Sequence, residues 1–211
     1  MTEPRTVPTG NVYDKYETSN PIERRLVEGF LSTLTEYVRS LGNVQSILDV
    51  GCGEGHVAMC LRECVPDASY CALDIDRELV AEATADDPDA GTVVASACEL
   101  PWRDRQFDLV LALEVLEHID RPELALAEIA RVTRHASIIS VPNEPLWRVL
   151  NMARGAYLSD LGNTPGHLQH WGGRSFRRFL QTELEVVDMR RPLPWLMALC
   201  RRGPDVHCTP A

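Results

Sequence analysis

A glutamate–histidine pair offers the side chains best suited to proton transfer. Glu117 and His118 end the sequence EVLEH at 114–118, directly after the apolar run 107–113. An imidazole titrates near neutral pH, so His118 can accept a proton from a hydroxyl group or orient a substrate by a hydrogen bond. The alternative is that the pair only fixes the conformation of its own loop. We predict His118 and Glu117 as catalytic residues and keep the structural alternative open.

The same segment contains a candidate set of metal ligands. If residues 114–118 formed one helical turn, Glu114, Glu117 and His118 would lie on one side of it. His167, in the later sequence GHLQHW, would add a second imidazole. Two nitrogen and two oxygen ligands suit a divalent transition metal. The sequence leaves the presence of a metal open.

A glycine-rich segment, ILDVGCGEG at 47–55, indicates the binding of a nucleoside cofactor. Its apolar residues predict a buried strand, and its alternating glycines allow a sharp turn against a ligand before a helix begins. A dinucleotide fingerprint needs a glycine at residue 56, where the chain has His56. Asp74 follows the next apolar run, where a carboxylate can accept both ribose hydroxyls of an adenosine-containing ligand.

Strands and helices alternate along the part of the chain that carries these residues. Strands are predicted at 46–50, 69–74, 91–95, 107–113, 136–141 and 184–190, and a run at 195–200 closes a hairpin. Helices are predicted at 21–41, 55–64, 76–85, 121–133 and 174–182. This alternation predicts a parallel sheet with right-handed crossovers. A polar arm at 1–19 and a long segment at 142–172 are expected to cover the site.

Composition bounds the domain organisation, the location and the partners. The 211 residues suffice for one α/β domain, and we expect no membrane span because no apolar run is long enough. Seven cysteines without a CxxC pair indicate reduced thiols in the cytoplasm. The net charge is −10, although residues 145–211 hold 9 Lys+Arg against 5 Asp+Glu. The acidic main body argues against a nucleic-acid partner, whereas the basic part can steer an anionic substrate.

These motifs, in this order, resemble the class I S-adenosylmethionine-dependent methyltransferases. The matching sequences are DVGCGEG at 49–55, LDI at 73–75, ELPW at 99–102, FDLV at 107–110 and EVLEH at 114–118. The resemblance covers residues 46 to about 141. It implies a single-domain, seven-stranded Rossmann-like α/β fold with a mostly parallel sheet and an antiparallel last strand. It also implies that S-adenosyl-L-methionine is the cofactor, and it says little about the methyl acceptor.

The resemblance implies a cofactor site built from several segments. The methionine part would lie over Gly51 and Gly53 with Asp49 beneath it, while Asp74 would hold the ribose. The adenine would contact Ile75, Ser96 and Ala97, and Ser96 stands where the family often has an aspartate. The complete predicted set is Asp49, Gly51, Gly53, Gly55, Asp74, Ile75, Ser96, Ala97 and Leu113.

Two tyrosines in the polar arm, Tyr13 and Tyr16, resemble lid residues of related enzymes. The alternative is that they are surface aromatic residues.

The preferred function is methylation of a small molecule, with oxygen as the expected acceptor atom. The EVLEH sequence together with His167 also resembles the metal site of small-RNA 3′-terminal 2′-O-methyltransferases, so metal-dependent methylation of RNA 3′ ends is an alternative. The same sequence is, however, widespread in metal-free small-molecule methyltransferases. A third hypothesis is a catalytically silent cofactor-binding module in an assembly. The acceptor, the metal dependence and the oligomeric state do not follow from the sequence.

Overall fold

The computed structural model describes residues 20–153, 157 and 160–203, and Tyr13 and Tyr16 lie outside them. Seven strands form one sheet: β1 (Ser46–Val50), β2 (Ser69–Asp74), β3 (Gly91–Val94), β4 (Phe107–Leu113), β5 (Thr133–Pro142), β6 (Leu184–Arg190) and β7 (Trp195–Arg202). The helices are α1 (Pro21–Ser40), α2 (His56–Cys64), α3 (Arg77–Asp86), α4 (Pro122–Val132), α5 (Leu146–Ala153) and α6 (Gly173–Leu180), with a 3₁₀ turn η1 (Leu116–His118). None of the described helices is both long and apolar enough to cross a membrane.

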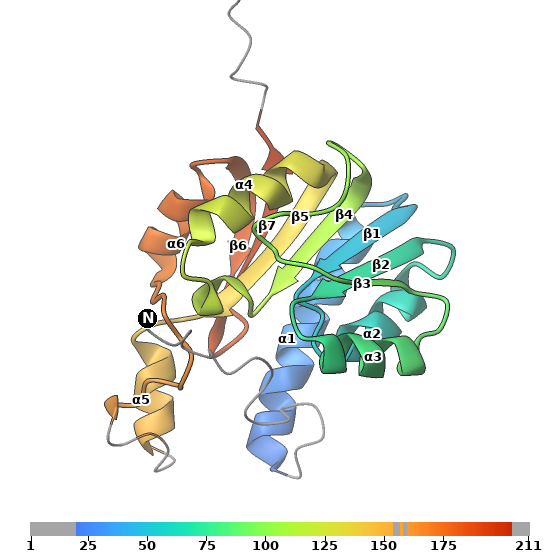
Figure 1. The fold of residues 1–211 in the computed structure, drawn as a ribbon. Helices are drawn as coiled ribbons and strands as arrows, with labels where there is room; N and C mark the ends of the chain where they lie inside the picture. Colours follow the sequence, from blue (N-terminus) through green and yellow to red (C-terminus); the bar gives the residue numbers. More distant parts are fainter. Residues whose placement is uncertain (1–19, 154–156, 158–159, 204–211) are drawn as a thin grey trace, which may run out of the picture.

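The strand order is β3-β2-β1-β4-β5-β7-β6 (Figure 1). The first five strands are parallel to one another, and β7 is antiparallel to both of its neighbours. The predicted sheet and its closing hairpin are therefore confirmed. The last strand lies between β5 and β6 rather than at the edge, because the hairpin folds back into the sheet.

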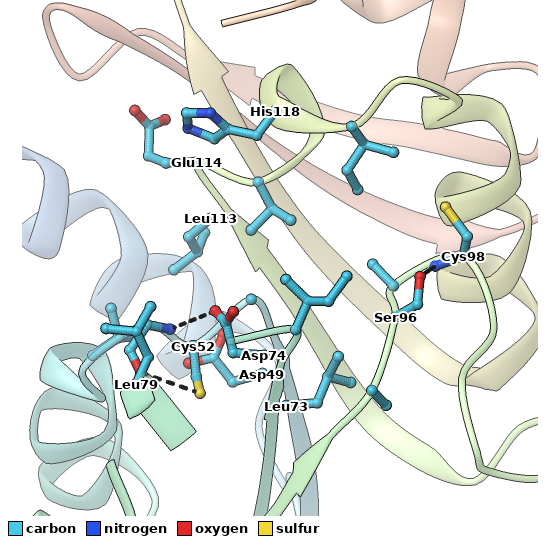
Figure 2. A pocket seen from close by; sticks show the side chains of 18 of the residues that line it. Asp49, Cys52, Leu73, Asp74, Leu79, Ser96, Cys98, Leu113, Glu114 and His118 are labelled. Carbon is cyan, nitrogen blue, oxygen red and sulfur yellow. Dashed lines mark hydrogen bonds between the residues drawn. The ribbon is translucent and has the colours of Figure 1, made fainter. Parts of the chain in front are cut away.

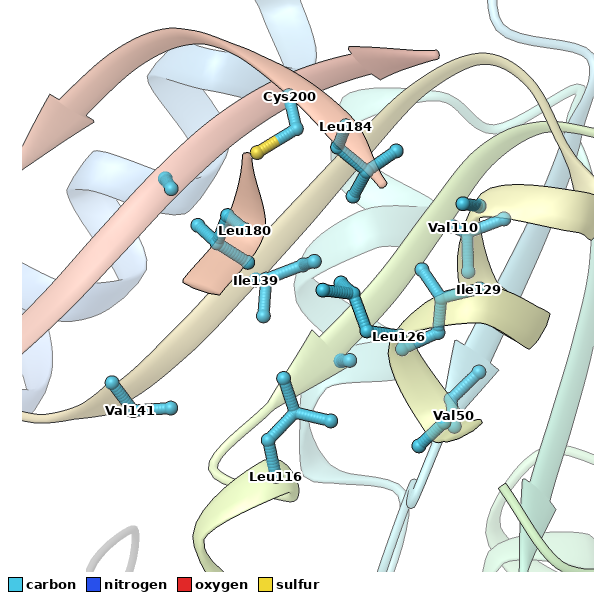
Figure 3. Packing of buried hydrophobic residues seen from close by; sticks show 14 of the residues in the cluster. Val50, Val110, Leu116, Leu126, Ile129, Ile139, Val141, Leu180, Leu184 and Cys200 are labelled. Atoms are coloured by element: carbon cyan, nitrogen blue, oxygen red, sulfur yellow. The ribbon is translucent and has the colours of Figure 1, made fainter. Parts of the chain in front are cut away.

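Helices cover both faces of the sheet, and alternation along the strands supplies the two cores. On β4, Val110 and Ala112 belong to the cluster that packs under α4 and α6 (Figure 3). Leu109 and Leu111 belong to the opposite cluster, which packs against α1 and α2. All four side chains have no exposed surface. Since successive side chains of a strand point to opposite faces, one apolar run serves both cores.

Helix α5 lies in the segment 142–172, for which no regular structure was predicted. Its inner face is held by polar contacts: Trp147 Nε1 donates to Thr164 Oγ1 at 2.9 Å, and Asn151 Nδ2 donates to the Gly162 carbonyl at 2.9 Å. The density of Gly, Asn and Pro in this segment obscured a short helix. Pro145, directly before its start, was the available signal, because proline is common at helix N-termini.

Candidate cofactor and acceptor site

A cavity of about 450 Å³ opens at the carboxyl ends of β1, β2 and β4. The strand order reverses between β1 and β4, and ligands of open α/β sheets bind at such a switch point. Figure 2 shows side chains from the glycine loop, the end of β2, the segment after β3 and the segment after β4 around this cavity. The predicted residues in its lining are Asp49, Gly51, Gly53, Asp74, Ile75, Ser96, Ala97, Leu113 and His118.

The glycine loop has a backbone that only glycine adopts easily. Gly51 has φ +72°, and a Cβ there would lie 2.5 Å from Cγ2 of Val115. The backbone N–H groups of Gly51 and Cys52 both donate to the Leu73 carbonyl, at 2.8 and 3.0 Å. The loop is therefore fixed to the end of β2 and closed from above by the segment after β4.

Gly55 does not line the cavity, although it was predicted to contact the cofactor. It has φ +85° at the residue before α2, and a Cβ there would lie 3.2 Å from Cβ of Ala83. Its role is to let the chain enter α2 close to α3. The sequence spacing did not separate this turn-forming glycine from the two that face the cavity.

Asp74 presents a fixed carboxylate at the end of β2. Its Oδ2 accepts the N–H of Gly53 at 3.1 Å, and its Oδ1 accepts the N–H of Asp76 at 3.0 Å. Each carboxylate oxygen can accept a further hydrogen bond. Two acceptor atoms at this place suit a vicinal diol, as predicted for a ribose.

The adenine end of the predicted site is less polar. Ile75 is 63% exposed and contributes an apolar surface to the cavity. The hydroxyl of Ser96 accepts the N–H of Cys98 at 3.2 Å, so one of its lone pairs is used within the loop. A contact from Ser96 to an adenine amino group therefore depends on the second lone pair.

Asp49 is a buried carboxylate on the floor of the cavity, 2% exposed. The hydroxyl of Tyr70 donates to its Oδ2 at 2.6 Å. Burial raises the pKa of Asp49 to about 6, and the negative charge of Asp74 adds to the rise, while the Tyr70 hydrogen bond opposes it. A cation bound above this carboxylate would favour the ionised form.

Leu113, Glu114, Val115 and His118 line the other end of the cavity (Figure 2). The imidazole of His118 has its Nδ1 3.1 Å from the Gly166 carbonyl oxygen. Because a carbonyl can only accept, Nδ1 carries the proton of the neutral ring and the basic lone pair belongs to Nε2. The Gly166 carbonyl thus selects the tautomer of His118 that carries its proton on Nδ1.

Glu117 is 1% exposed and does not line the cavity, although it was predicted as a catalytic residue. Its backbone carbonyl accepts the N–H groups of Leu168 and Gln169, at 2.7 and 3.0 Å. These bonds hold Leu168 and Gln169 against the turn that follows β4. The carboxylate of Glu117 therefore lies close to the His118 ring but outside the cavity lining.

Three of the four candidate metal ligands come together. Ligand atoms of Glu117, His118 and His167 lie within 4.8 Å of one another, and the two imidazole rings have centroids 4.9 Å apart. Glu114 does not join this group in the described part of the chain, because it has φ +62° and precedes the 3₁₀ turn. Its Oε1 instead accepts the hydroxyl of Ser140 at 3.2 Å. The four-residue helical arrangement, which the sequence left open, is therefore not the one found in the structure.

Sequence reasoning missed several residues that shape the cavity. Tyr70 holds Asp49, Val115 closes over Gly51, and the Gly166 carbonyl orients His118. Of these residues, only Tyr70 could have been identified from the sequence, because a tyrosine within a buried strand needs a hydrogen-bond partner for its hydroxyl.

A model of the methyltransferase domain family matches residues 48–141. The malonyl-[acyl-carrier protein] O-methyltransferase of Hahella chejuensis is 32% identical over 114 residues, which is 52% of this chain and 41% of that protein. The O-methyltransferase rstn1 of Aspergillus nomiae is 29% identical over 163 residues, 66% of this chain and 72% of that protein. The chain thus spans less than half of the first relative and almost three quarters of the second.

Among solved structures, magnesium protoporphyrin IX methyltransferase from Synechocystis with bound SAH has a similar fold. The TM-score is 0.66 at 17% identity, with 90% of this chain and 91% of that chain covered. At this identity the likeness describes the fold, and it extends over nearly the whole of both chains.

Proposed function

The chain belongs to the class I S-adenosylmethionine-dependent methyltransferases, and from this premise we propose that it methylates an oxygen atom of a small molecule. The cavity fits the family's cofactor: glycine backbone approaches it closely, Asp49 provides a buried negative charge and Asp74 provides two acceptor atoms. Bound there, S-adenosylmethionine supplies a methyl group on a positively charged sulfur. Two curated relatives named as O-methyltransferases support oxygen as the acceptor atom.

The observation that carries this proposal is the contact between Nδ1 of His118, which lines the cavity, and the Gly166 carbonyl oxygen at 3.1 Å. With Nδ1–H held by the Gly166 carbonyl, Nε2 is the atom that can take a proton from a hydroxyl acceptor. S-adenosylmethionine held by the glycine loop, Asp49 and Asp74 would supply the methyl group and leave as S-adenosylhomocysteine, and Nε2 of His118 would take the proton that a hydroxyl acceptor releases as its oxygen is methylated. An acceptor that is already a carboxylate needs only orientation by the same ring.

The covering segment contributes alignment and the exclusion of water. The hydrogen bonds of this segment, residues 142–172, to the Glu117 carbonyl and the contact of its Gly166 with His118 support this role. Alignment of the reacting atoms in a water-poor site supplies much of the rate of a displacement reaction. The six cysteines of the described region are all free, which supports a location in the reducing cytoplasm.

The test is a panel of hydroxyl, carboxylate and amine acceptors, assayed with S-adenosylmethionine and read by mass spectrometry. We expect a methyl ether or ester from at least one oxygen acceptor. His118→Ala should lower turnover about 10²–10⁴-fold and leave S-adenosylhomocysteine affinity nearly unchanged. His135→Ala, a change at an exposed histidine on β5, is the matched control. Methylation of amines alone, or full activity in His118→Ala, would contradict the proposal.

A metal-assisted form of the same transfer is the second candidate, and the grouping of Glu117, His118 and His167 favours it. These side chains would hold a divalent ion, with the Gly166 carbonyl orienting His118 as carbonyls orient metal-bound imidazoles. The ion would polarise the acceptor oxygen.

Calorimetric titration with Mn²⁺ separates the two candidates without needing the acceptor. A metal site predicts saturable binding that His118→Ala and His167→Ala each abolish and His135→Ala preserves. Activity would then be lost in chelator and restored by added metal. If Mn²⁺ does not bind and chelator has no effect, the metal-free mechanism stands.

A further inference from the structure

The solvent face of α6 carries a row of arginines without acidic partners. Arg174, Arg177 and Arg178 are exposed, and within the described part of the chain their guanidinium groups form no ion pair or hydrogen bond. The guanidinium of Arg191 lies at the start of this helix, with Nη2 3.0 Å from the place of a Cβ on Gly173. These four residues are the α6 arginine face.

Several arginines elsewhere in this protein are paired with carboxylates. Arg62 contacts Asp87 at 2.9 Å, and Arg134 contacts Asp108 at 2.7 Å. The chain has 31 Asp+Glu for 21 Lys+Arg, so acids are in surplus. The lack of ion pairs at Arg174, Arg177 and Arg178 in the described part of the chain is therefore not explained by a shortage of acidic residues.

The spacing on α6 is unfavourable for an isolated helix. Arg174 stands at i, i+3 and i, i+4 to Arg177 and Arg178, so three like charges share one face and repel one another. Phe176 and Leu180 bury the opposite face against the sheet. A partner that brings negative charge to the outer face would remove this repulsion.

The α6 arginine face adjoins the segment 142–172. Helix α6 begins at Gly173, two residues after Trp171, whose carbonyl accepts the N–H of Glu144 just beyond β5. Figure 1 shows α6 beside α4 on one side of the sheet. A molecule docked on α6 would therefore sit at the end of the segment 142–172, in which the Gly166 carbonyl contacts His118.

We propose that the α6 arginine face docks an acidic protein, one that presents carboxylates on a helix or loop. The eight residues of α6 extend about 12 Å, which matches one short acidic element. A nucleic acid or an anionic membrane is an extended polyanion and would continue onto the acidic remainder of the surface. Residues 1–144 hold 26 Asp+Glu against 12 Lys+Arg, which opposes such a partner. Planar guanidinium groups also pair with carboxylates through two parallel hydrogen bonds.

The experiment uses the full chain and a fluorescein-labelled helical peptide with glutamates at i, i+3 and i+4. Fluorescence anisotropy at low and physiological salt measures its affinity for the wild type and for Arg174→Glu/Arg178→Glu. The matched control is Arg39→Glu/Arg103→Glu, which reverses two exposed arginines on α1 and on the segment before β4. Thermal unfolding and S-adenosylhomocysteine binding confirm that each variant is folded.

We expect the α6 reversal to weaken peptide binding by about 10- to 100-fold, as for the loss of several charge pairs, and the control to stay near the wild type. Equal binding by both double variants would overturn the proposal. A single-stranded DNA or phosphatidylglycerol vesicles of matched charge serve as competitors. If the DNA or the vesicles bound more strongly than the peptide, and the α6 reversal weakened that binding, the partner would be that polyanion and not an acidic protein.

Discussion

The buried carboxylate of Asp49 should destabilise the cofactor-free protein at neutral pH. Burial raises its pKa from 3.8 to about 6, so between these values the folded chain binds more protons than the unfolded chain. The free energy of unfolding therefore falls as the pH rises from about 3.8 to about 6, and it stays at the lower value above that range. A shift of about two pKa units corresponds to roughly 3 kcal/mol, which is an upper limit for the cost of the ionised group.

Asp49→Asn removes this ionisation and keeps an oxygen that can accept the Tyr70 hydrogen bond. The variant should gain stability over the wild type at pH 7.5, by up to about 3 kcal/mol, with roughly half of that gain already present at pH 5. Urea unfolding of both proteins at the two pH values measures the difference. Asp67→Asn, at an exposed residue, is the control.

The same change should weaken the binding of S-adenosylmethionine more than that of S-adenosylhomocysteine, because only the former carries a positive sulfur. Calorimetry with both ligands at pH 7.5 provides this comparison. A stability gain that is the same at pH 5 and pH 7.5 would refute the reasoning, since it would show that ionisation of Asp49 is not the cause.

Three further predictions concern the cavity wall. Asp74→Ala should weaken S-adenosylhomocysteine binding by about 1–3 kcal/mol in calorimetry, the cost of leaving hydrogen-bonding groups unpaired; unchanged affinity would remove Asp74 from the site. Gly51→Ala should lower the melting temperature, because its Cβ would lie 2.5 Å from Val115, and adding Val115→Ala should restore part of the loss by relieving that contact. Tyr70→Phe removes the hydrogen bond that opposes the raised pKa of Asp49, so S-adenosylmethionine binding should strengthen at a higher pH than in the wild type; an unshifted pH profile would show that this bond is unimportant.

Local patterns in the sequence determined the fold and predicted the proposed cofactor half of the cavity. Alternating apolar runs and helical spacing predicted the seven strands, since burial on both faces requires such runs. The glycine spacing and Asp74 predicted the cofactor half. A backbone can approach a ligand closely where glycines alternate in the sequence, and the Asp74 carboxylate is fixed because β2, which it ends, pairs with β1, the strand before the glycine loop.

The acceptor half was decided by contacts between residues far apart in the chain. The Gly166 carbonyl meets His118 across 48 positions, and the tautomer of the ring depends on it. His167 joins Glu117 and His118 because the next two residues, Leu168 and Gln169, donate backbone hydrogen bonds to the Glu117 carbonyl. Glu114 leaves that group because its backbone is left-handed, which the helical spacing of the sequence did not indicate. The pairing of distant backbone groups has no sequence pattern of its own, so only the tertiary structure placed these side chains together.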